Sequence, residues 1–123
     1  MLAFAALAAA AAVAAGAGRL VAVRPAGDAA VSVIELVGDR PLSFTTLRLA
    51  SPPRVVVDVA DADPSGVAPA QLVDDGTVKR IGVAPVGGST ARVVIELAGE
   101  TEFDVRAVGP VVQVRVARLA RPQ

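Results

Sequence analysis

The chain has 123 residues, of which 54% are hydrophobic and 2% aromatic, and its 12 basic and 12 acidic side chains cancel. A net charge of zero leaves no basic field for phosphate groups, so nucleic acid is not expected as a partner. The sequence has no Cys and no His, which excludes thiol catalysis, disulfides, His acid–base chemistry and the usual zinc sites; no metal and no cofactor are expected.

Residues 1–18 form an apolar, Ala-rich stretch that predicts an export signal. The stretch ends in Ala15-Gly16-Ala17, the small-x-small form that signal peptidase accepts, so cleavage is expected after Ala17. No Lys or Arg precedes the apolar run, which is unusual for a signal. An uncleaved anchor is the alternative, although a helix of about 17 residues is slightly short of a hydrocarbon core of about 30 Å. Once the signal is removed, no membrane contact is expected.

After the signal, short Val-rich segments are separated by Gly, Pro and Asp, a pattern typical of strands and turns. The segment at 54–60 alternates best, because Val55, Val57 and Val59 share one face. The segment at 30–37 alternates poorly, which predicts either two covered faces or a β-bulge. The pattern predicts eight strands, at residues 20–24, 30–37, 43–49, 54–60, 78–84, 91–98, 103–108 and 111–117.

Residues 61–77 join the fourth and fifth strands and contain four Asp but no Lys or Arg. This composition predicts a surface crossover with one helical turn near residues 69–73. Residues 61–66 resemble the opening of a calcium loop, but Leu72 stands where the closing Glu would be, so an acidic turn is the preferred interpretation. Asp74 and Asp75 are interpreted in the same way, as part of a solvated turn.

The two groups of four strands repeat each other. Residues 33–38 read VIELVG and residues 94–99 read VIELAG, while residues 53–60 and 110–117 read PRVVVDVA and PVVQVRVA. The repeat predicts that Ile34 superposes on Ile95, Glu35 on Glu96 and Val57 on Val114. It favours an all-β fold, a β-sandwich of two similar four-stranded sheets around an aliphatic core. The repeat halves are placed at about 20–60 and 78–117, in a single domain at 19–118 that is followed by a tail at 119–123.

Four charged residues on predicted strands are the candidates for ligand binding. The spacing of four places Arg54 and Asp58 on one outward face, about 13 Å apart along the strand, and it does the same for Arg92 and Glu96. These faces are candidates for a polar recognition surface. Cross-strand ion pairing on a solvated sheet face, worth a few tenths of a kcal/mol, explains them equally well, and the residues alone leave both interpretations open.

Four Arg residues, at positions 106, 115, 118 and 121, follow Asp104 with no acidic residue after it. Such a basic C-terminal edge is suited to an acidic partner. The preferred alternative is an edge strand that is protected from aggregation by its charges.

Three segments in this order resemble the AMIN domain: residues 51–59 read SPPRVVVDV, residues 78–83 read VKRIGV, and residues 91–97 read ARVVIEL. The resemblance covers roughly residues 20–118. It implies a β-sandwich and a periplasmic, non-catalytic module, typically appended to cell-wall amidases or type IV pilus secretins, which it localises through peptidoglycan. Arg54, Asp58 and Arg92 occupy the matched motif positions.

The sequence and this resemblance together predict an exported, periplasmic module that binds peptidoglycan and localises envelope machinery. The alternative is a protein–protein docking module of a type IV pilus secretin or septal complex, with secretin or amidase proteins as partners and no direct glycan binding. A hydrolase is not expected, because the chain has no nucleophile–base pair and no metal ligand set; no catalytic residue is assigned. Without Trp or Tyr, hydrogen bonds and charge would have to hold the glycan.

Overall fold

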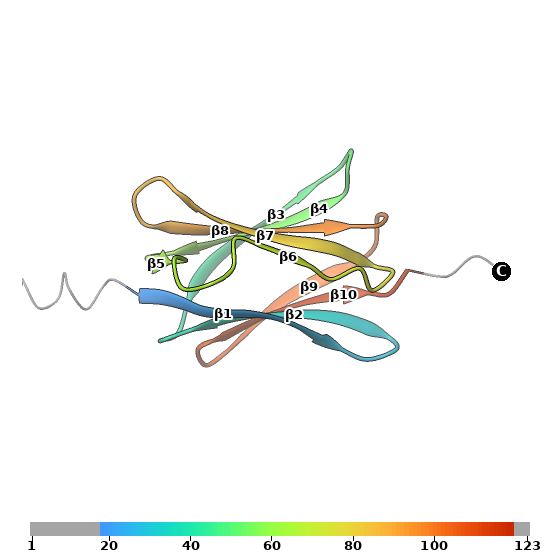
Figure 1. Cartoon of the computed structure of the whole chain (residues 1–123). Coiled ribbons are helices and arrows are strands. Elements are labelled where there is room, and N and C mark those ends of the chain that lie inside the picture. The colour runs from blue at the N-terminus through green and yellow to red at the C-terminus, as the bar shows by residue number, and fades with distance from the viewer. Residues whose placement is uncertain (1–17, 120–123) are drawn as a thin grey trace, which may run out of the picture.

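The computed structural model describes residues 18–119, which form two β-sheets packed face to face (Figure 1). This range contains no helix that could cross a membrane. The predicted export signal lies outside it except for Gly18, the first residue of β1. The strands are β1 (Gly18–Gly27), β2 (Val31–Gly38), β3 (Ser43–Leu49), β4 (Arg54–Ala60), β5 (Ala62–Asp63), β6 (Ala70–Leu72), β7 (Val78–Val86), β8 (Thr90–Leu97), β9 (Phe103–Val108) and β10 (Val111–Ala117).

The first sheet has the order β5-β1-β2-β10-β9 and the second sheet has the order β3-β4-β8-β7-β6. The predicted all-β sandwich is therefore confirmed, with four long strands in each sheet. Each sheet also has a fifth, short strand, β5 or β6, and both of these come from the segment at residues 61–77.

The helical turn predicted near residues 69–73 is wrong, because Ala70–Leu72 forms β6 and pairs antiparallel with β7. The segment at 61–77 is also less exposed than its Asp content indicates. Ala62 is buried, and Val67 and Val73 pack against the core. These apolar contacts hold the segment along the sheet edges, where the neighbouring strands satisfy its backbone hydrogen bonds.

The core lies between the sheets and is formed by Val, Ile and Leu side chains from the inward positions of the long strands. In β2, Ile34 and Leu36 are fully buried, and the positions between them are half-buried. β2 therefore alternates regularly. The bulge of this hairpin lies instead in β1, between Leu20 and Ala22.

The repeat halves exchange strands between the sheets. Because β1 and β2 share a sheet with β9 and β10, while β3 and β4 share one with β7 and β8, the order β1-β2-β10-β9 maps onto β7-β8-β4-β3. Val114 lies opposite Ile34, whereas its counterpart Val57 lies opposite Val93 and not Ile95. If Val57 superposes on Val114, as predicted, the strand register places Ile34 on Val93 and not on Ile95. The predicted superpositions therefore cannot all be correct. The duplicated motif lies two residues further along β8, and a shift of two keeps the same side chains facing inward.

A polar network built around Asp75 closes one end of the sandwich. Asp75 Oδ1 accepts hydrogen bonds from the backbone N–H groups of Thr77 and Val78, at 2.9 and 2.7 Å. Its Oδ2 accepts one from the Ser32 hydroxyl at 2.6 Å and lies 3.1 Å from Arg118 Nη1. Ser32 and Thr77 are both buried. The interpretation of Asp75 as part of a solvated turn is therefore wrong, because the end of the sandwich buries donors that need an acceptor.

Candidate functional site

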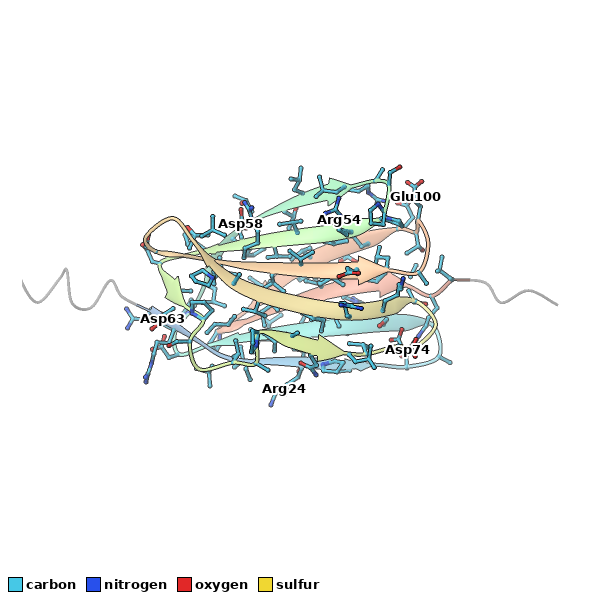
Figure 2. The ribbon with its side chains drawn as sticks, turned by 45° about the horizontal axis from the view of Figure 1, so that its top comes forward. Arg24, Arg54, Asp58, Asp63, Asp74 and Glu100 are labelled. Atoms are coloured by element: carbon cyan, nitrogen blue, oxygen red, sulfur yellow. The ribbon has the colours of Figure 1, made fainter. Side chains whose placement is uncertain are left out.

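The outer face of the second sheet carries all four predicted site residues. Alternation along β4 and β8 turns Arg54 and Asp58, and likewise Arg92 and Glu96, away from the core. Because β4 pairs directly with β8, the two sets form one surface, in which Arg54 lies opposite Glu96 and Asp58 lies opposite Arg92. Figure 2 shows Arg54 and Asp58 on the same strand of this sheet. We refer to the outward side chains of β3, β4, β8 and β7 as the candidate surface.

Asp58 and Arg92 form a bidentate ion pair. Arg92 Nε lies 2.8 Å from Asp58 Oδ1, and Arg92 Nη2 lies 2.9 Å from Oδ2. The hydrogen bond from Arg92 lowers the pKa of Asp58 in spite of partial burial, and the same bond raises the pKa of Arg92. Of the two interpretations left open by the sequence, cross-strand ion pairing therefore describes Asp58 and Arg92, whose charges cancel at neutral pH.

Arg54 and Glu96 lie opposite each other but do not form an ion pair. Glu96 Oε2 lies 3.7 Å from Arg80 Nε on the other side, and Arg54 Nε donates a hydrogen bond to the Pro52 carbonyl at 3.2 Å. Among residues 18–119, no carboxylate lies within 4.0 Å of the Arg54 guanidinium. Arg54 is therefore a positively charged group of the candidate surface with no carboxylate partner among residues 18–119, and Lys79, exposed at the bulge of β7 beside Arg80, is another.

An apolar strip separates the charged rows of the candidate surface. Leu47, Val56 and Val94 lie side by side on β3, β4 and β8. Leu47 is 55% exposed and Val56 is nearly covered. Leu47, with part of Val94, therefore supplies the exposed apolar area beside the polar groups, and such a combination is found in ligand sites.

A shallow depression of about 290 Å³ lies beside Asp58 at one end of the candidate surface. It is lined by Ser43, Phe44, Thr45, Asp58, Ala60 and Thr90. The three hydroxyl groups in it can each donate and accept hydrogen bonds, as a hydroxyl-rich or amide-rich ligand requires. We refer to this hollow as the hydroxyl pocket.

Sequence reasoning did not find the three hydroxyl residues of this pocket or Arg80. The alternation of β3 and β8 does place Ser43, Thr45 and Thr90 outward, which is a local signal. Their convergence on Asp58 depends on the order β3-β4-β8, which joins segments about 30 residues apart and has no local sequence signature.

The calcium-like segment forms a turn in the structure. Asp63 Oδ1 accepts a hydrogen bond from the backbone N–H of Ser65 at 2.9 Å, which is the geometry of an Asx turn. Within residues 18–119, no three acidic side chains come together as a metal site would need.

Comparison with known families gives a match to the family model described as the AMIN domain, over residues 21–120. The matched range begins within β1 and extends past the end of β10, so it contains both sheets and every residue of the candidate surface. The resemblance carried by three short sequence segments is thereby confirmed over the whole sandwich. No curated protein matches the chain.

Proposed function

The chain belongs to the AMIN domain family, and from this membership we propose that it is a non-catalytic envelope module that binds peptidoglycan through its candidate surface. AMIN domains are typically periplasmic targeting modules of amidases and secretins, which fits an exported protein. In this proposal the module localises envelope machinery, and Arg54, Asp58, Arg92 and Glu96 lie at or beside the contact.

The observation that carries the proposal is the unpaired guanidinium of Arg54, close to an apolar strip on a sheet face that also bears hydroxyl groups. Peptidoglycan offers matching chemistry, because its glycan carries hydroxyl and N-acetyl groups and its stem peptides carry carboxylates. Arg is well suited to a carboxylate, since a guanidinium can donate two parallel hydrogen bonds. The Asp58–Arg92 pair would position neighbouring groups without adding net charge.

Co-sedimentation with purified sacculi at low salt tests this proposal. The wild-type chain is expected in the pellet, and Arg54→Gln is expected to weaken binding about fivefold, because it removes one charge-assisted contact at an exposed site. Arg40→Gln is the matched control, since Arg40 lies in the loop between β2 and β3 and its change should leave binding unaltered. Recovery of the wild-type chain entirely in the supernatant would overturn the proposal.

A second candidate function, docking to a secretin or septal protein, rests on the free edge of β3. β3 ends the second sheet, and most of its side chains are exposed. Arg48 of β3 donates to the Thr101 carbonyl at 3.0 Å and lies 4.8 Å from the Phe103 ring centre, so the edges β3 and β9 lie on the same side of the sandwich. An edge strand of this kind can accept an extended segment of another protein. A complex that survives digestion of the glycan would favour this candidate.

A further inference from the structure

The outer face of the first sheet has a second depression, of about 310 Å³. It is lined by Val31, Glu102, Phe103, Asp104, Arg115 and Ala117. By strand register these positions correspond, one to one and in this order, to Thr90, Ser43, Phe44, Thr45, Asp58 and Ala60 of the hydroxyl pocket. The repeat has therefore built the same hollow twice, once on each outer face. We refer to the second hollow as the charged pocket.

The two pockets differ in chemistry at corresponding positions. Asp58 lies opposite Arg92 and is neutralised by it. Its counterpart Arg115 lies between Val33 and Asp104, and Asp104 forms its ion pair with Arg106 instead. Among residues 18–119, no carboxylate lies within 4.0 Å of the Arg115 guanidinium. The pKa of Asp28 is lowered mainly by hydrogen bonds from the backbone N–H groups of Ala30 and Val31, and the charge of Arg115 adds a minor contribution without forming an ion pair. Arg115 is therefore a half-buried residue whose guanidinium has no carboxylate partner among residues 18–119.

The opposite wall of the charged pocket is acidic. Glu102 and Asp104 stand where the hydroxyl pocket has Ser43 and Thr45. Asp104 Oδ2 accepts a hydrogen bond from Arg106 Nε at 3.1 Å, while Glu102 forms no ion pair with any residue in 18–119. The pocket thus offers the guanidinium of Arg115 on β10 and the carboxylate of Glu102, the residue before β9, with Val31 and Ala117 as its apolar lining.

We propose that the charged pocket binds a zwitterionic amino-acid group, a carbon that carries both an ammonium and a carboxylate. Arg115 receives the carboxylate, Glu102 receives the ammonium, and Val31 and Ala117 contact the carbon chain. The inference rests on the proposed function in that the uncrosslinked diamino acid of a peptidoglycan stem peptide carries such a group. The site itself is separate, because it lies on the opposite outer face from Arg54.

Calorimetric titration with two synthetic tripeptides tests this proposal. The first is L-Ala–γ-D-Glu–meso-diaminopimelate, and the second is the same peptide with the free-amine end of the diamino acid amidated at its carboxylate. The wild-type chain is expected to bind the first peptide saturably and the second about tenfold or more weakly, since a charge-assisted hydrogen-bond pair is lost. Arg115→Gln should weaken binding of the first peptide by a similar factor.

Arg24→Gln is the matched control, because Arg24 lies on β1 of the same sheet and does not line the charged pocket. Figure 2 shows it far from Arg54. It should leave tripeptide binding within about twofold of the wild type, as expected for an exposed charge outside the site. Equal binding of the two tripeptides, or unchanged binding by Arg115→Gln, would overturn the proposal, as would a wild-type chain that binds neither. If sacculi sediment the chain but the tripeptide does not bind, only the proposal for the charged pocket is refuted. If the tripeptide binds but sacculi do not sediment the chain, the proposed role of the candidate surface is refuted.

Discussion

Replacing Asp75 by Asn is expected to lower the free energy of unfolding by about 2 kcal/mol and the melting temperature by roughly 10 °C. The carboxylate accepts hydrogen bonds from Ser32, Thr77 and Val78 and contacts Arg118, and its side chain is three-quarters buried. An amide keeps the size of the side chain but offers only one acceptor oxygen. The Asn amide N–H then takes the place of the oxygen that accepts from Ser32, so the Ser32 hydroxyl has to reverse its hydrogen bond. Arg118 faces that N–H in place of a charged oxygen and keeps only its bonds to the Asp28 and Asp75 carbonyls.

The matched control for this change is Asp74→Asn, the same substitution one residue earlier. Asp74 is exposed and has a positive φ of 52°, a conformation that Asn tolerates as well as Asp does. Thermal unfolding followed by circular dichroism should therefore give a melting temperature near that of the wild type. Equal melting temperatures for the two variants would show that the Asp75 network does not stabilise the fold.

The same network predicts how stability depends on pH. Burial opposes ionisation of Asp75, but the hydrogen bonds from Ser32, Val78 and Thr77 and the charge of Arg118 outweigh it, so the pKa is lowered. A carboxyl whose pKa is lower in the folded state stabilises the protein fully above its unfolded pKa of about 3.9, and this contribution is lost as the pH falls through the folded value. The wild-type chain should lose more stability than Asp75→Asn on going from about pH 5 to pH 2.

Truncation of buried side chains in the central strands of the two sheets is expected to lower the free energy of unfolding more than any other change. Leu36 in β2 and Ile95 in β8 are buried and correspond by register. Leu36→Ala and Ile95→Ala should each lower the free energy of unfolding by about 3 kcal/mol, through lost apolar burial and the cavity that remains. The two costs should agree within about 1 kcal/mol, because each residue occupies the same place in a duplicated core.

Leu47→Ala is the control for these core changes, since more than half of the Leu47 side chain is exposed. Its cost should not exceed about 0.5 kcal/mol. Urea denaturation of the four proteins provides the measurement. If one core variant were as stable as the wild type while the other failed to fold, the two sheets would not share one cooperative core of equal halves.

The long strands were predictable because their signals are local. The predicted ranges 43–49, 54–60, 103–108 and 111–117 coincide with β3, β4, β9 and β10, since each is a Val- or Thr-containing alternation between turn residues. β5 and β6 were missed because strands of two and three residues are too short for periodicity to indicate. They form because β1 pairs with β5 and β7 pairs with β6.

The arrangement of side chains across strands was not predictable from the sequence. The outward direction of Arg54, Asp58, Arg92 and Glu96 follows from alternation, but their union on one surface depends on β4 pairing with β8. The prediction of a charged edge strand holds for only one of the C-terminal Arg residues, Arg106, which is exposed on the edge strand β9. Arg115 lies on β10, between β2 and β9, and Arg118 contacts Asp75 and the Asp28 carbonyl. Arg121 lies outside the described residues.

The central claim, that the outer face of the second sheet contacts peptidoglycan, is tested most directly by mapping the contact. The measurement is a nuclear magnetic resonance titration of the ¹⁵N-labelled chain with soluble peptidoglycan fragments that contain both glycan and stem peptide. We expect the amide shifts of β4 and β8 around Arg54, Asp58 and Arg92 to change saturably. Shift changes that leave β4 and β8 untouched, or no changes at all, would contradict the account.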